Sequence, residues 1–176
     1  MKRNWMLVLV SGLGLYAGGA AYAADGAALY QSYCAACHQA NGEGIPGTYP
    51  FINGPIGRLS EFPEGREFLI ATVLFGLKGE MMQRGQVYNG VMPGYAAAMS
   101  DAEVAALLNW LKRQWNNANF GANVPDYTPE EVAAVRAKKL SPDDVHAMLQ
   151  KVESIMHAVN GRGRGRHGTG GGPPKR

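Results

Sequence analysis

The only two cysteines in the chain lie close together, and a histidine directly follows the second one. The stretch SYCAACHQ places Cys34 and Cys37 three positions apart, with His38 next. Two thiols at this spacing can form a redox-active disulfide, supply half of a zinc site, or attach a haem covalently. Each alternative would give the protein a different function, so other parts of the sequence must distinguish between them.

The N-terminal segment, residues 1–23, has the layout of a secretory signal peptide. Lys2 and Arg3 precede an apolar run, and small residues follow it up to the AYA sequence that ends at Ala23. The apolar run is shorter than the ~20 residues of a membrane-spanning helix, which argues against an uncleaved anchor. We therefore expect cleavage near Ala23 and an exported protein, in the periplasm or on the outer side of the inner membrane.

The C-terminal segment, residues 161–176, differs sharply in composition from the part of the chain before it. Its sequence, GRGRGRHGTGGGPPKR, is mostly glycine and charge and has no large apolar side chain, so we expect it to be disordered. It carries a net charge of +5, whereas residues 24–160 carry −4. This basic tail is expected to make at most weak contact with anionic lipid at a membrane surface.

Helical patterns account for most of the remaining chain, whose length suits one small domain. Asp25, Ser100, Thr128 and Ser141 are expected helix caps, and Glu103 completes a capping box with Ser100. The expected helices fall within residues 25–39, 63–76, 100–115, 128–140 and 141–159. Glycine, proline and asparagine recur between residues 39 and 58 and between 76 and 95, which predicts irregular loops. No alternating strand pattern is recognisable, so the expected fold is mainly α.

Two of the three interpretations of the cysteine pair fit the rest of the sequence poorly. A thioredoxin-like redox site requires a βαβ framework, for which the sequence gives no strands. A structural zinc site requires four ligands, but the other histidines lie far along the chain. On one straight helix His146 and His157 would be about 16 Å apart, too far to share a metal. We interpret both as exposed helical histidines.

The third interpretation agrees with both the motif and the expected compartment. Cys-x-x-Cys-His is the attachment signature of c-type haem. Two thiols one short turn apart can reach the two vinyl groups on one edge of the porphyrin, and the following residue then lies beneath the iron. We therefore expect one covalently bound haem c, with thioether bonds at Cys34 and Cys37 and His38 as the proximal iron ligand.

The residue on the other side of the iron decides between an electron carrier and a ligand-binding protein. A thioether closes the sixth position and favours electron transfer at a raised reduction potential. Met92 lies in the sequence YNGVMPGY, where glycine and proline allow a loop to press one side chain against the haem. Met81, Met82 and Met99 are the alternatives, and Met99 is better explained as packing before the Ser100 cap. We favour Met92.

Three stretches together resemble class I cytochromes c. They are YQSYCAACHQANGEGIPGTYP, YNGVMPGYAAAMSDAEVAALLNWL and YTPEEVAAVRAKKLSP. The chain closely resembles the Thermus group of soluble cytochromes c, which carry a C-terminal helical extension, and the resemblance runs from about Asp25 to about Leu149. It implies a cytochrome c domain over residues 24–117 and a helical extension over residues 118–160.

The resemblance also implies roles for individual residues. Thioether bonds would form at Cys34 and Cys37, and the axial iron ligands would be His38 and Met92. The first helix, through Gly26 and Tyr30, would cross the late helix near Trp110 and Leu111, because glycine lets two backbones approach closely.

This chain departs from the usual Pro-Pro-Leu run after the haem motif, where it reads Pro50, Phe51, Ile52. We expect the carbonyl of Pro50 to accept a hydrogen bond from the far ring nitrogen of His38 and so to orient the imidazole. Pro46 is the alternative acceptor.

The expected function is that of a soluble, monomeric, non-enzymatic carrier of single electrons. The resemblance implies redox partner proteins: a quinol-oxidising complex as donor and a terminal haem–copper oxidase as acceptor, with no nucleic-acid partner. One alternative is a haem c subunit of a periplasmic dehydrogenase or nitric oxide reductase. A small-ligand sensor or peroxidase is the other, against which the Met92 loop argues.

Charge is scarce in the two segments expected to flank the haem edge. Residues 31–49 contain no lysine, and residues 85–99 contain no charged side chain. The expected docking surface is therefore largely uncharged, and its apolar candidates are Ala35, Ile45, Val91 and Tyr95.

Overall fold

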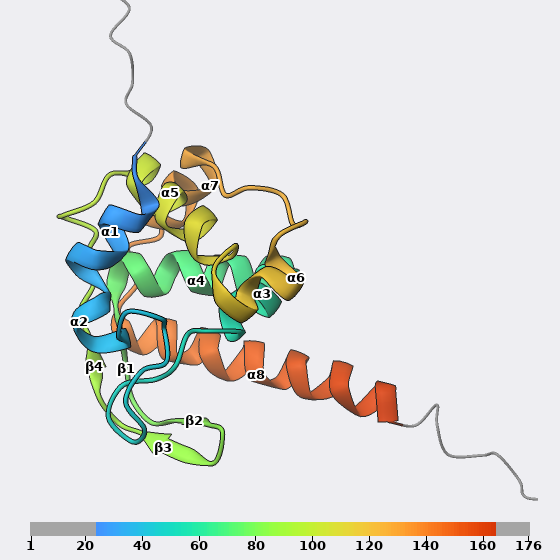
Figure 1. The fold of residues 1–176 in the computed structure, drawn as a ribbon. Coiled ribbons are helices and arrows are strands. Elements are labelled where there is room, and N and C mark those ends of the chain that lie inside the picture. Colours follow the sequence, from blue (N-terminus) through green and yellow to red (C-terminus); the bar gives the residue numbers. More distant parts are fainter. Residues whose placement is uncertain (1–23, 165–176) are drawn as a thin grey trace, which may run out of the picture.

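The computed structural model describes residues 24–164, with side chains placed as far as residue 158. The expected signal peptide and residues 165–176 lie outside the described residues. The fold is mainly α, as predicted (Figure 1). The helices are α1 (Gly26–Tyr33), α2 (Ala35–His38), α3 (Pro55–Leu59), α4 (Pro63–Phe75), α5 (Asp101–Leu111), the 3₁₀ helix η1 (Trp115–Asn117), α6 (Ala118–Gly121), α7 (Pro129–Arg136) and α8 (Pro142–Arg164).

Side-chain caps fix where the longer helices begin. The Asp25 carboxylate accepts hydrogen bonds from the first backbone N–H groups of α1. Ser100 and Glu103 form the expected capping box at α5. The hydroxyls of Thr128 and Ser141 accept from backbone N–H groups in the first turns of α7 and α8. Each cap pairs N–H groups that would otherwise lack partners at the helix start.

Helices α1 and α5 cross at close range, as the resemblance to class I cytochromes implied. A Cβ atom at Gly26 would lie 2.6 Å from the carbonyl oxygen of Ala106 and would also overlap Trp110. Tyr30 is fully buried at this crossing, with its ring centroid 5.2 Å from that of Trp110 and 5.4 Å from that of Trp115. The crossing fixes the end of α1, and therefore the position of the cysteine motif that follows it.

We predict that Gly26→Ala lowers the free energy of unfolding by about 1–3 kcal/mol, the usual cost of an overpacked contact. The added methyl group can be accommodated only if α1 and α5 move apart. Gly90→Ala is the matched control, because its nearest neighbour would be the Thr48 carbonyl oxygen at 3.8 Å. Urea unfolding of the two holoproteins measures the difference. Equal stability of the two variants would contradict the tight crossing.

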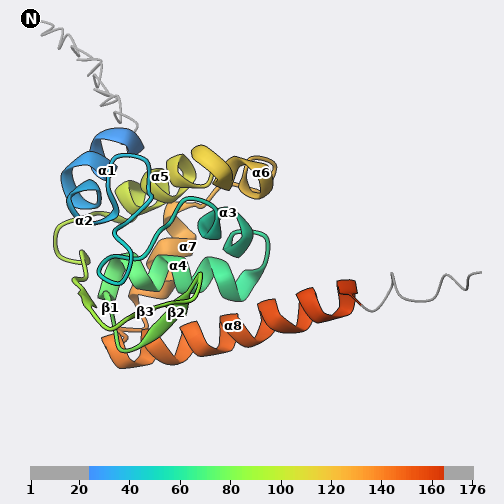
Figure 2. The ribbon, with the colours of Figure 1, turned by 60° about the horizontal axis from the view of Figure 1, so that its bottom comes forward.

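The residues after Asn117 pack onto the preceding helices. Helix α7 lies against α4 and α5, and α8 runs along α4 and reaches β1 (Figure 2). Arg66 on α4 forms an ion pair with Glu131 on α7 at 2.7 Å. Lys112 is fully buried and donates to the carbonyl of Pro125 at 3.1 Å and to the Asp126 carboxylate at 2.9 Å. These contacts tie the C-terminal helices to the part of the chain that carries the cysteine motif.

Four short strands correct the expectation of a strand-free fold with an irregular segment between residues 76 and 95. Strands β1 (Leu77–Lys78) and β4 (Val91–Met92) pair antiparallel, and so do β2 (Met81–Gln83) and β3 (Gln86–Tyr88). The sequence could not reveal them, because strands of two or three residues are too short to show alternation.

Two further expectations about the C-terminal part of the chain need correction. Helix α8 ends at Arg164, beyond the boundary expected at residue 160. His146 is only partly exposed, and its Nε2 atom lies 2.8 Å from the carbonyl oxygen of Glu80. His157 is exposed, as expected. Among the helices of residues 24–164, none is long and apolar enough to cross a lipid bilayer.

Candidate haem-binding site

The cysteine motif forms one tight turn at the end of α1. Backbone N–H groups of Cys37 and His38 both donate to the carbonyl of Cys34, at 3.2 and 2.9 Å. This turn places both thiols on one side of the chain, because residues three apart share a helical face. Neither cysteine forms a disulfide; Cys34 is buried and Cys37 partly buried.

Burial raises the pKa of the Cys34 thiol to about 12, and the neighbouring Cys37 adds to the shift. A redox-active cysteine needs the opposite, a lowered pKa that maintains the thiolate nucleophile. The environment of Cys34 therefore argues against disulfide exchange as the function of the motif.

His38 is oriented by a backbone carbonyl. Its Nδ1 atom lies 2.8 Å from the carbonyl oxygen of Pro50, the contact that we expected for this proline, whereas Pro46 is exposed. Since a carbonyl oxygen only accepts, Nδ1 carries the proton and Nε2 keeps a free lone pair. Burial lowers the pKa of His38, although the bond to Pro50 opposes this effect. The imidazole is thus neutral, which is the form that binds metals.

The backbone beside Pro50 is held by a side chain that the sequence did not single out. The Gln83 amide accepts a hydrogen bond from the Phe51 N–H at 3.1 Å and donates to the Phe51 carbonyl at 3.0 Å. The guanidinium of Arg84 stacks on the Phe51 ring, 3.4 Å from its centroid. Strand β2 and the residue after it therefore support the segment that orients His38. No sequence signal connects these positions, which lie 32 residues apart.

Met92 lies on β4, where it pairs with Leu77 of β1. Gly76 has a φ of +80°, and a Cβ atom there would lie 2.8 Å from the backbone nitrogen of Gly94 and would overlap the Met92 carbonyl. The backbone N–H of Tyr95 donates a hydrogen bond of 2.9 Å to the carbonyl oxygen of Val73, near the end of α4. The backbone around Met92 is therefore fixed from both sides, and its side chain is partly buried.

The other candidate methionines have different environments. Met99 is 3% exposed and packs in the core before α5, as expected. Met82 is 67% exposed on β2, and Met81 beside it packs partly against the core.

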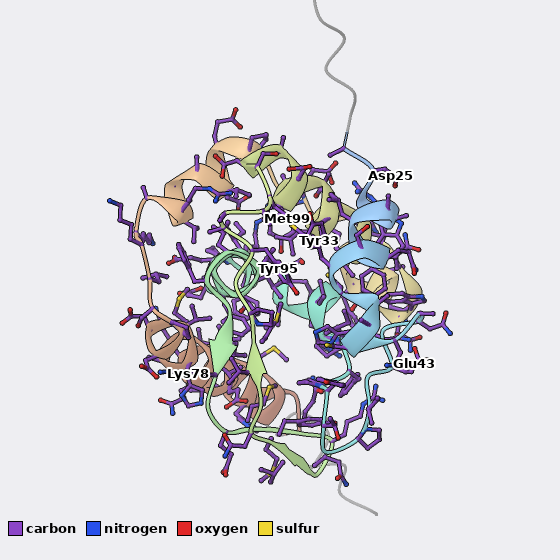
Figure 3. The ribbon with its side chains drawn as sticks, turned by 90° about the vertical axis from the view of Figure 1, so that its left-hand side faces the viewer. Asp25, Tyr33, Glu43, Lys78, Tyr95 and Met99 are labelled. Atoms are coloured by element: carbon purple, nitrogen blue, oxygen red, sulfur yellow. The ribbon has the colours of Figure 1, made fainter. Side chains whose placement is uncertain are left out.

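Two tyrosines bring the Met92 segment to the cysteine motif. The Tyr95 hydroxyl donates to the carbonyl of Tyr33 at 3.0 Å, and the two ring centroids lie 5.3 Å apart. Figure 3 shows the two tyrosines near each other beside α1. Burial raises the pKa of Tyr95, and nearby Cys34 and Cys37 contribute further. Tyr95 thus lies close to both thiols, and it follows Met92 closely in the sequence.

The donor atoms gathered here suit a covalently attached haem. They are two free thiols, one neutral imidazole nitrogen and one partly buried thioether. Within residues 24–164 no group of three or more histidine, cysteine, aspartate or glutamate side chains is placed to hold a metal ion, so a zinc site lacks ligands.

A family model for cytochrome c matches residues 23–115. The chain belongs to the cytochrome c family. This cytochrome is 41% identical over 152 residues to a cytochrome c-552 from one strain of Thermus thermophilus, covering 86% of this chain and 98% of the relative. It is 43% identical over 129 residues to another cytochrome c-552 of Thermus thermophilus, covering 73% of this chain and 97% of that protein.

A more distant relative of this cytochrome is a fructose dehydrogenase cytochrome subunit of Gluconobacter japonicus. It is 28% identical over 100 residues, which cover 53% of this chain and 19% of the subunit. The expected resemblance to class I c-type cytochromes is confirmed, as is the mainly α fold. The protein is a haem electron carrier with covalently bound haem c.

Proposed function

We propose that the haem is held by thioether bonds at Cys34 and Cys37, with its iron between Nε2 of His38 and the sulfur of Met92. The observation that carries the proposal is the hydrogen bond from His38 Nδ1 to Pro50, at 2.8 Å, because it leaves Nε2 as the ligand atom. The Tyr95–Tyr33 hydrogen bond supports Met92 as the second ligand, since it holds the end of the Met92 segment beside the cysteine motif.

In this arrangement the haem supplies a one-electron redox couple, and the protein sets its environment. Pro50 fixes the orientation of His38 and strengthens the imidazole as a donor. Met92 would supply the second iron ligand, and a thioether in that place would exclude external ligands and favour the reduced state. Phe68, Leu74 and Met99 belong to the buried apolar core. The residues therefore favour transfer of electrons over chemistry on a bound substrate.

The cytochrome is proposed to carry electrons outside the inner membrane, from a quinol-oxidising complex to a terminal haem–copper oxidase. The likeness to cytochromes c-552 spans almost the full length of those relatives, 98% and 97%, which supports a freestanding carrier. The likeness to the fructose dehydrogenase cytochrome subunit favours a second candidate, a haem subunit of a dehydrogenase. Copurification of a catalytic partner with the cytochrome would support the second candidate, a dehydrogenase subunit.

The partner surface is proposed to be apolar. Exposed large apolar side chains gather on the loop after His38 and on strands β2 to β4; they are Ile45, Tyr49, Met82, Val87 and Val91. Val91 is 76% exposed beside Met92, and Met82 pairs with Val87 across the β2–β3 hairpin. The expected candidates Ala35 and Tyr95 are partly buried. A patch of this kind binds through desolvation, which depends little on salt.

We predict that electron transfer to the purified terminal oxidase changes little between low and physiological ionic strength. A carrier steered by a charged ring would instead lose roughly 10- to 1000-fold in rate over such a change. Val91→Asp should slow the second-order rate by about tenfold, because it places a charge in the desolvated contact. Ala133→Asp, at an exposed position of α7, is the matched control and should be neutral. Steep salt dependence of the wild type would contradict the apolar surface.

A further inference from the structure

The beginning of α8 contacts the turn that follows β1. His146 on α8 lies with Nε2 2.8 Å from the carbonyl oxygen of Glu80. The backbone of Gly79 packs against the same ring, since a Cβ atom there would lie 3.0 Å from Nε2. Asp143, one turn earlier on α8, forms an ion pair with Lys78 at 2.9 Å. Figure 3 shows Lys78 beside this end of α8.

The strand held by α8 is the partner of the strand that carries Met92. Leu77 pairs with Met92, and Lys78 pairs with Val91. Strand β1 is therefore contacted by α8 at one end, and it pairs along its edge with β4, the strand that carries Met92. Displacement of the turn at residues 78–80 would weaken one of the supports of Met92, the pairing with β1, and leave the Tyr95 contacts with Val73 and Tyr33 in place.

The β1–β4 pair is too small to hold its own geometry. Each strand has two residues, and isolated two-stranded sheets are marginally stable even when longer. Segments with so few contacts open locally at low free-energy cost. The position of Met92 must therefore depend on contacts made from outside the pair.

We propose that α8, through His146, braces the β1–β4 pair and thereby limits how often Met92 leaves the iron. The inference rests on the proposed ligation by Met92. His146 is a positioning residue, because it acts on Met92 through β1. The Glu80 carbonyl only accepts, so Nε2–H of His146 donates the hydrogen bond. The Lys78–Asp143 pair is exposed, 45% and 74% at its two side chains, and contributes little.

The position of Gly79 strengthens this assignment. Its φ of +108° is rarely adopted by residues with a side chain, and its open face is occupied by the His146 ring. The hydrogen bond of His146 therefore holds Glu80, and the contact of its ring holds Gly79, the adjacent residue of the same turn. Loss of both should loosen the turn more than loss of the hydrogen bond alone.

The test measures how fast imidazole replaces Met92 in the oxidised holoprotein. An external nitrogen ligand can bind only after the Met92–iron bond has broken, so its capture rate reports the opening of the strand. We expect His146→Ala to raise the capture rate about fivefold, in line with the loss of one side-chain hydrogen bond. His146→Phe keeps a ring against Gly79 and should fall between His146→Ala and the wild type.

Val152→Ala is the matched control, because Val152 is buried on α8 nearly two turns beyond His146 and away from β1. It should lower global stability in urea without changing imidazole capture. The proposed role of His146 would be wrong if His146→Ala left the imidazole capture rate unchanged. It would also be wrong if Val152→Ala raised that rate equally. If Met92→Ala did not open the sixth position, Met92 would not be the iron ligand, and the proposed role of His146 would fail as well.

Discussion

A Cys34→Ala, Cys37→Ala double variant will mature without covalently bound haem. The chain has no other cysteine, so no thioether bond can form elsewhere. The apolar side chains expected to surround the haem would then enclose a space that they cannot fill, and the variant should lose most of its stability, since large cavities are strongly destabilising. Intact-mass measurement of the purified protein, coexpressed with haem-attachment machinery, checks the result.

The two single variants serve as controls for this prediction. Cys34→Ala and Cys37→Ala each keep one thiol, so each should retain a single thioether bond in part of the purified protein. A double variant that still carried covalent haem in competent cells would show that the attachment site was wrongly assigned.

Met92→Ala is expected to lower the reduction potential and to let carbon monoxide bind to the reduced protein. A thioether ligand favours ferrous iron, and axial ligands set haem potentials over a range of about 0.8 V. A decrease on the order of 0.1 V or more is therefore expected when the thioether is lost. Potentiometric titration and the carbon monoxide difference spectrum measure the two effects.

The other methionines provide the controls for Met92. Met82→Ala should leave the potential unchanged because Met82 is exposed, 67%, on β2. Met99→Ala should lower stability, because Met99 is buried in the core, while leaving the axial ligands in place. If Met82→Ala or Met99→Ala abolished the methionine–iron bond and Met92→Ala kept it, the ligand would have been misassigned.

Local features of the sequence predicted the parts of the site that depend on adjacent residues. Cys34, Cys37 and His38 share one turn, so their arrangement follows from spacing alone. The caps at Asp25 and Ser100 are equally local, and both are present. The Pro50 contact with His38 was expected from the resemblance, because Pro50 stands where class I cytochromes often have a Pro-Pro-Leu run after the haem motif.

Contacts between distant segments could not be predicted in the same way. The pairing of Leu77 with Met92 involves strands too short to show a pattern. The Gln83 contact with Phe51 spans 32 residues, and the His146 contact with Glu80 spans 66. Each depends on how the chain packs in three dimensions, and a single glutamine or histidine in the sequence carries no signal of its partner.

Absorption spectroscopy of the purified holoprotein tests the central claim, a covalently attached haem held between His38 and Met92, most directly. We predict a haem that resists extraction into acidified organic solvent, a low-spin spectrum in both oxidation states, and the near-infrared methionine–iron band in the oxidised form. An extractable haem, or a covalently bound haem whose oxidised spectrum lacks that band, would contradict this account.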